Sequence, residues 1–179
     1  MPRIHILGAS GSGTTTLGAA LAARLGCPHE DSDAYFWLPT EPPFTTPRPR
    51  EERLALLLPR LAGADWVFSG SALNWGQPVE PLYELIVFLR LDPALRMERL
   101  RRRERARYGA RIESGGDMAE SSREFLAWAE SYDTSGPERR SLAAHEHWLA
   151  QQRCPVLRLD SAAPVEALAN AILAACGAG

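Results

Sequence analysis

The sequence predicts an α/β protein with three layers, a parallel five-stranded sheet that carries helices on both faces. Short runs rich in β-branched and aromatic residues alternate with segments of helical spacing, which is typical of βαβ units. The run at residues 85–89 is apolar without interruption, as expected of a strand buried on both faces. A glycine-rich segment joins the first short run to the first helical segment, which favours the same architecture.

Five segments have the composition of short strands and are bounded by turn-forming or polar residues. The first ends at Gly8, and the second has an acidic exit at Asp33. Because helical segments separate most of these strands, neighbouring strands are expected to be parallel. The predicted strands are residues 4–7, 28–33, 66–68, 85–89 and 155–159.

The segments between the strands carry helix signals. Gly26 ends the first helical run, Pro59 ends or kinks the second, and Pro93 opens a long arginine-rich helix. The predicted helices cover residues 17–25, 51–61, a long segment from 93, and the stretches near 119–131, 137–152 and 165–175. Residues 39–49 contain five prolines and residues 108–118 contain three glycines, so both are predicted loops.

Composition limits the function classes. The 179 residues, 45% hydrophobic and 23% charged, suffice for one globular core without a disulfide or metal staple. A net charge of −2 argues against a protein that coats nucleic acid. Three distant cysteines and a short first apolar run predict a cytoplasmic protein without a signal peptide. The apolar stretch from Ala167 to Ala178 is too short to span a bilayer, so no membrane partner is expected.

Residues Gly8 to Thr15 have the spacing G-x-x-x-x-G-[K]-[ST], with Thr14 at the lysine position. Glycines let successive N–H groups face a phosphate, and the following helix N-terminus favours an anion. A plain strand-to-helix turn is the alternative. The chain has no lysine at all, so an arginine compensates or turnover is low. The residues expected to bind the nucleotide here are Gly8, Ala9, Ser10, Gly11, Ser12, Gly13, Thr14, Thr15 and Thr16.

With these motifs in order, nearly the whole chain resembles the P-loop kinase group of nucleoside-monophosphate (adenylate-type) and shikimate-type kinases. The loop itself resembles that of archaeal-type cytidylate kinases, where threonine can occupy the lysine position. The resemblance implies a P-loop NTPase fold with a helical lid, ATP or GTP as donor, Mg²⁺ as cofactor, and a small-molecule acceptor. It also implies a single domain, 1–179, with an acceptor-binding region at about 34–62 and a lid insertion at about 105–140.

Asp31 and Asp33 follow the second strand and resemble the acidic pair of shikimate-type kinases. That resemblance implies that both carboxylates, with the Thr15 hydroxyl, hold the metal, and that Asp33 orients the acceptor hydroxyl. Phe68–Gly70 resembles the Asp-Gly of the adenylate kinases, with Ser69 in place of the aspartate, which moves the metal ligands to the second strand. The alternative is a helix N-cap at Asp33 or Ser32, before Ala34.

Residues 96–107 hold seven arginines and two glutamates. They resemble the helix that enters the lid of the monophosphate kinases, which implies that Arg99 and Arg103 face the donor phosphates from one side of a helix. Arg139 and Arg140 resemble the arginines of the returning lid helix. Asp160 belongs to a segment that resembles the loop packed against the donor base. The alternatives are a solvated helix for the arginines and a turn cap for Asp160.

The acceptor is expected under residues 34–53 and 69–82, where aromatic and arginine residues gather. These side chains suit a planar or anionic acceptor such as a nucleoside monophosphate, although some of the aromatics also suit the core. The residues expected to bind the acceptor are Arg48, Arg50, Gly70 and Trp75.

The sequence therefore predicts a Mg²⁺-dependent small-molecule kinase whose partners are a nucleotide and an acceptor. Its alternative is a nucleotide-binding protein with little turnover, because Thr14 replaces the lysine. Recognition of nucleic acid through residues 96–107 is a third hypothesis, which the net charge disfavours.

Overall fold

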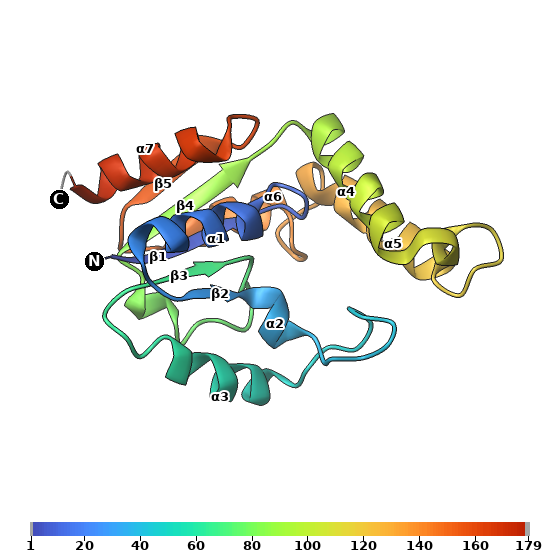
Figure 1. Cartoon of the computed structure of the whole chain (residues 1–179), viewed down its shortest axis with the longest axis horizontal. Helices are drawn as coiled ribbons and strands as arrows, with labels where there is room; N and C mark the ends of the chain where they lie inside the picture. The colour runs from blue at the N-terminus through green and yellow to red at the C-terminus, as the bar shows by residue number, and fades with distance from the viewer. Residues whose placement is uncertain (1, 178–179) are drawn as a thin grey trace.

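The sheet has five parallel strands in the order β2-β3-β1-β4-β5 (Figure 1). The computed structural model describes residues 2–177, so the two ends of the predicted domain, Met1 and residues 178–179, lie outside the described residues. The strands are β1 (Arg3–Gly8), β2 (His29–Asp31), β3 (Trp66–Ser69), β4 (Leu85–Arg90) and β5 (Val156–Asp160). The predicted α/β class with a parallel five-stranded sheet is thus confirmed.

Helices cover both faces of the sheet, because the strand side chains alternate between two apolar clusters. On one face, Ile4 and Ile6 of β1 pack with α1 (Thr14–Leu25) and α7 (Val165–Gly177). On the other face, Leu7 of β1 packs with residues of α3 (Arg50–Arg60) and α6 (Leu142–Leu149). Both clusters include β4 residues, which explains the unbroken apolar run of that strand.

Two helices, α4 (Pro93–Tyr108) and α5 (Ala119–Glu130), project together beyond the carboxyl edge of the sheet (Figure 1). Met97 and Leu100 of α4 pack against α5 in a third apolar cluster. At its base, the buried Arg96 donates hydrogen bonds to the carbonyl oxygen of Ala129 (2.9 Å) and to the carboxylate of Asp133 (2.6 Å). We call α4, α5 and their connection the α4–α5 hairpin.

The remaining segments are short. Helix α2 (Ser32–Phe36) follows β2 directly, and the 3₁₀ turns are η1 (Glu80–Leu82), η2 (Gly109–Ile112) and η3 (Ser131–Asp133). The second strand is shorter than predicted because Asp31 already acts as the N-cap of α2. The helix predicted at 137–152 forms only over α6, because the buried Ser141 caps it by accepting a hydrogen bond from the Ala144 N–H (3.0 Å).

Across residues 2–177, none of the helices combines the length and the apolar character that a bilayer crossing requires. Ala178, the last residue of the predicted apolar C-terminal stretch, lies outside the described residues.

Candidate active site

The glycine loop, residues 8–16, lies at the carboxyl end of the central strand β1 and leads into α1. Gly11 and Gly13 have φ angles of +85° and +89°, which favour glycine because they turn the chain sharply. Inside the turn, the buried Ser12 hydroxyl donates to the carbonyl oxygen of Ala9 (2.8 Å). Gly13 gives α1 no side-chain cap, so the first-turn N–H groups are available to an anion.

The loop is packed tightly against its neighbours. A Cβ atom at Gly8 would lie 2.7 Å from the carbonyl oxygen of Leu89, and one at Gly11 would lie 2.8 Å from Cγ of Leu100. The first contact joins the loop to β4 and the second joins it to α4. The α4–α5 hairpin therefore packs directly against the glycine loop, where Leu100 lies beside Gly11.

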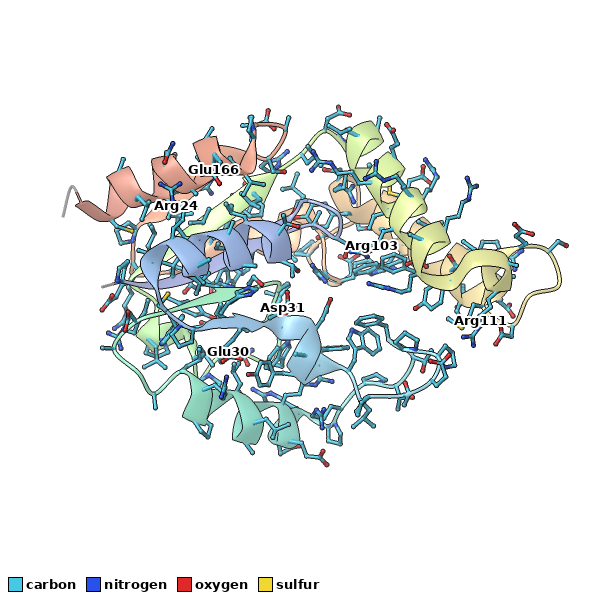
Figure 2. The ribbon with its side chains drawn as sticks, viewed as in Figure 1. Arg24, Glu30, Asp31, Arg103, Arg111 and Glu166 are labelled. Atoms are coloured by element: carbon cyan, nitrogen blue, oxygen red, sulfur yellow. The ribbon has the colours of Figure 1, made fainter. Side chains whose placement is uncertain are left out.

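A cleft of about 1700 Å³ opens between this loop, α2 and the α4–α5 hairpin. Of the glycine loop, residues 9–16 line the cleft, whereas Gly8 lies behind them in β1. The other predicted site residues that line it are Asp31, Asp33, Gly70, Trp75, Arg99, Arg103 and Arg140. Asp31 and Arg103 lie on the two sides of the same opening (Figure 2).

Asp31 is held in place from two directions. One carboxylate oxygen accepts a hydrogen bond from the N–H of Asp33 (2.9 Å), and the other accepts one from the hydroxyl of Ser69 (3.0 Å). The Ser69 hydroxyl also lies 2.9 Å from Nε2 of His29. Gly70, with a φ of +88°, follows Ser69, and any side chain at this position would overlap Ser32. The N-cap of α2 is therefore Asp31, not Ser32 or Asp33 as the alternative had it, and Asp31 still faces the cleft.

Asp33 stands in the first turn of α2 and lines the cleft. Asp33 is an exposed residue, but desolvation of its carboxyl by the cleft walls and the nearby charge of Asp31 raise its pKa, while Arg140 and Arg103 act in the opposite direction. A carboxyl group with a raised pKa beside a phosphate site can accept a proton from an acceptor hydroxyl.

The arginines divide into those that face the cleft and those that do not. Arg99 and Arg103 line it from α4, and a guanidinium nitrogen of Arg99 lies 3.5 Å from the carbonyl oxygen of Ser161. Arg140 lines it from the segment before α6 and donates to the carbonyl oxygen of Gly8 (3.1 Å). Its neighbour Arg139 is exposed and does not line the cleft.

On the predicted acceptor side, Gly70 and Trp75 line the cleft but Arg48 and Arg50 do not. Arg48 donates to the carbonyl oxygens of Tyr35 (3.0 Å) and Trp37 (3.3 Å), so it ties the loop after α2 to its own backbone. Arg50 is exposed and donates to Gln77 (2.8 Å). Sequence spacing alone could not show whether these two side chains point into the cleft or away from it.

Asp160, the last residue of β5, is exposed and accepts a hydrogen bond from the N–H of Ala162 (2.9 Å). It forms the turn cap expected of Asp160 or Ser161, a role that is compatible with the predicted packing against the donor base. The residues after it, 161–165, line the cleft in its place.

The structure also adds lining residues that the sequence analysis did not single out. Phe125 and Trp128 of α5 line the cleft, and so does Arg107 of α4, whose guanidinium lies 4.1 Å from the centre of the Phe44 ring. The i, i+3 spacing of the two α5 aromatics was the available signal, because it places them on one helix face.

The strand order, the glycine loop and the cleft define the chain as a protein with the fold of the P-loop kinases. The solved structures that it resembles include a shikimate kinase from Bacteroides thetaiotaomicron (TM-score 0.57, 19% identity, 98% of each chain). They also include a gluconokinase from Sinorhizobium meliloti 1021 (TM-score 0.54, 19% identity, 97% of this chain and 90% of that one).

No protein-family model matches the chain. The uncharacterized protein YqaC of Bacillus subtilis (strain 168) is 45% identical over 171 residues, which cover 95% of this chain and 94% of YqaC. The chain therefore belongs to the same family as YqaC.

Proposed function

We propose that this protein is a kinase that transfers the γ-phosphoryl group of ATP or GTP to a small-molecule acceptor. One observation carries the proposal: a single cleft is lined by the glycine loop, by Asp31 and Asp33, and by five arginines that include Arg99, Arg103 and Arg140. Phosphoryl transfer requires this combination, because catalysis consists mainly of positioning the reactants and stabilising charge. The P-loop kinase fold supports the same conclusion.

The donor phosphates would lie on the glycine loop, where uncapped N–H groups and the start of α1 favour an anion. The Thr15 hydroxyl and the carboxylates of Asp31 and Asp33 are oxygen donors on the cleft wall, which is the ligand chemistry that Mg²⁺ prefers. Mg²⁺, when bound with the nucleotide, neutralises negative charge on the phosphates. Asp31 keeps a fixed orientation because Ser69 and the Asp33 N–H hold it.

In the transfer step, the acceptor oxygen forms a bond to the γ-phosphorus as the bond between that phosphorus and the bridging oxygen breaks. ADP or GDP leaves with the electron pair, and the acceptor proton passes to the carboxylate of Asp33. Arg99 and Arg103 stabilise the charge on the transferring group from the hairpin side. The raised pKa of Asp33 suits this proton transfer.

The acceptor would lie near Gly70 and Trp75, on the side of the cleft where Phe36 and Phe44 also line the wall. Aromatic walls with Arg107 nearby suit a planar, anionic molecule, so nucleoside monophosphates are the first acceptors to test.

The test is nucleotide consumption with Mg-ATP or Mg-GTP and a panel of nucleoside monophosphates, shikimate and gluconate, alongside calorimetric binding of each nucleotide. We expect ADP or GDP release that depends on one class of acceptor. Tight nucleotide binding without such release would favour a nucleotide-binding protein instead, as the threonine at position 14 suggests. Absence of binding at millimolar nucleotide would overturn both functions.

A further inference from the structure

We infer that Arg140 supplies the positive charge that the glycine loop lacks, in the place where a P-loop lysine reaches the phosphates. This inference rests on the proposed function, because it requires a polyphosphate on the loop. The loop has Thr14 at the lysine position, and the chain contains no lysine that could replace it. Any compensating cation must therefore be an arginine that the fold brings to the loop.

Among residues 2–177, Arg140 is the arginine whose side chain hydrogen-bonds the glycine loop. Its terminal nitrogen Nη2 donates to the carbonyl oxygen of Gly8 at 3.1 Å, although the two residues are 132 positions apart in the chain. The guanidinium thus lies at the first glycine of the loop and lines the same cleft as Thr14. Arg99 instead lies against the carbonyl oxygen of Ser161, and Arg103 lies on the α4 wall.

Arg140 is preorganised in this position. The adjacent Ser141 is fully buried, donates to the carbonyl oxygen of Gly136 (2.7 Å) and caps α6, so the backbone beside Arg140 is fixed. The guanidinium carbon lies 5.6 Å from the centre of the Trp128 ring, which adds a cation–π contact. A side chain that is already in place loses little conformational entropy when an anion binds.

The buried position of this side chain leaves one of its hydrogen-bond donors unpaired. The Nε atom of Arg140 is buried and has no hydrogen-bond partner among the described residues. Unpaired buried donors are rare, and they concentrate at sites where function requires the group. Asp33 lines the same cleft, and its charge acts on this guanidinium, so the cation is close enough to interact with the proposed base.

The neighbouring His145 adds no second positive charge beside Arg140. His145 lies behind the segment, with its ring nitrogens 2.7 Å from the Tyr132 hydroxyl and 3.1 Å from the Ser71 hydroxyl. Burial, and secondarily the charge of Arg140, lower the pKa of His145 to about 3, so the ring is neutral at physiological pH. Arg140 is therefore the cation at this end of the loop.

The test is a cycle of four proteins: wild type, Arg140→Met, Thr14→Lys, and the double variant. Calorimetry measures binding of Mg-ATP and of inorganic tripolyphosphate, which probes the loop without a base or sugar. We expect Arg140→Met to weaken both by about 10- to 100-fold, as for loss of a charge-assisted hydrogen bond. The double variant should recover most of this loss, because the lysine returns a cation to the same place.

The single variant Thr14→Lys leaves Arg140 unchanged. It therefore still tests the inference if Arg140→Met does not fold. We expect it to change tripolyphosphate affinity by less than about threefold, because Arg140 already fills the site. A tenfold gain would show that the site lacks a cation and would overturn the inference. Arg140→Lys preserves the charge but not all of the guanidinium contacts, so it should lose less affinity than Arg140→Met.

The matched control is Arg105→Met, which removes the same charge from an exposed position of α4 outside the cleft and should bind as wild type does. If wild type binds both probes and Arg140→Met binds them equally well, the inference fails while the proposed function stands. If wild type binds neither probe, the proposed function fails, and the inference fails with it.

Discussion

At the scale of single residues, the cleft places carboxylates and guanidinium groups where each alters the other's protonation. Asp33 is the clearest case, since burial and the charge of Asp31 make its ionised form unfavourable, and Arg140 and Arg103 only partly offset this. Asp117, at the far end of the hairpin, is the opposite case: its two hydrogen bonds from Arg111 (3.0 and 2.8 Å) lower its pKa. The ionised form of an aspartate is thus disfavoured at Asp33, beside the cleft, and favoured at Asp117, at the end of the hairpin.

The first prediction concerns Asp33→Asn. Because the folded-state pKa of Asp33 is raised, its ionised form lowers the free energy of unfolding at pH values above that pKa. We expect the variant to melt at a higher temperature than wild type at pH 7. This difference should shrink as the pH falls through the folded-state pKa and should vanish below about 3.9, the ordinary aspartate value, where both states bind the proton. Turnover, where measured, should fall by about 10²- to 10⁴-fold.

The matched control for this prediction is Asp117→Asn. Its carboxylate has a lowered pKa, so the variant should lose stability at neutral pH, and that loss should disappear as the pH falls through the folded-state pKa. Melting curves of the three proteins from pH 2.5 to 7.5 measure the sign of each stability difference at neutral pH and its disappearance in acid. A lower melting temperature for Asp33→Asn at pH 7 would contradict the account of the cleft electrostatics.

At the scale of elements, the sequence predicts those features that depend only on residues close together in the chain. The glycine loop and the acidic exit of β2 follow from short segments, and parallel strands bring their carboxyl ends to one edge. The contact between Arg140 and Gly8 was not predictable, because it depends on the path of the chain between η3 and α6. For Arg48, spacing could not show that backbone carbonyls, rather than a ligand, hold the side chain.

The second prediction compares Gly11, in the glycine loop before α1, with Gly26, the C-cap of α1. Gly11 and Gly26 both have positive φ, so alanine costs about 1–2 kcal/mol at either position. At Gly26 the added Cβ meets open space, but at Gly11 it lies 2.8 Å from Leu100. We expect Gly11→Ala to lose a further ~1–3 kcal/mol through overpacking. Urea unfolding of the two variants measures the difference, and equal losses would show that the loop and α4 are not tightly packed.

At the scale of the whole molecule, the two walls of the cleft touch at the end remote from the sheet. The loop after α2 approaches the α4–α5 hairpin, where the Tyr108 hydroxyl donates to the carbonyl oxygen of Pro43 (3.0 Å). Arg111, at the outer end of the hairpin (Figure 2), donates to the carboxylate of Glu41 (2.6 Å), and Arg107 covers the Phe44 ring. A ligand that enters the acceptor side must pass this contact or separate it.

The third prediction is that removing this contact loosens the loop and leaves the sheet unchanged. Tyr108→Phe combined with Glu41→Gln deletes one hydrogen bond and one exposed ion pair, each worth about 0.5–1 kcal/mol. The loop amides of Leu38 and Arg48, which donate to Thr46 and Phe36, should then exchange with deuterium up to about tenfold faster. Amides of β1 should keep their wild-type rates. Glu120→Gln, an exposed position on α5, is the control and should exchange as wild type does. Unchanged loop exchange in the double variant would mean that other packing holds the walls together.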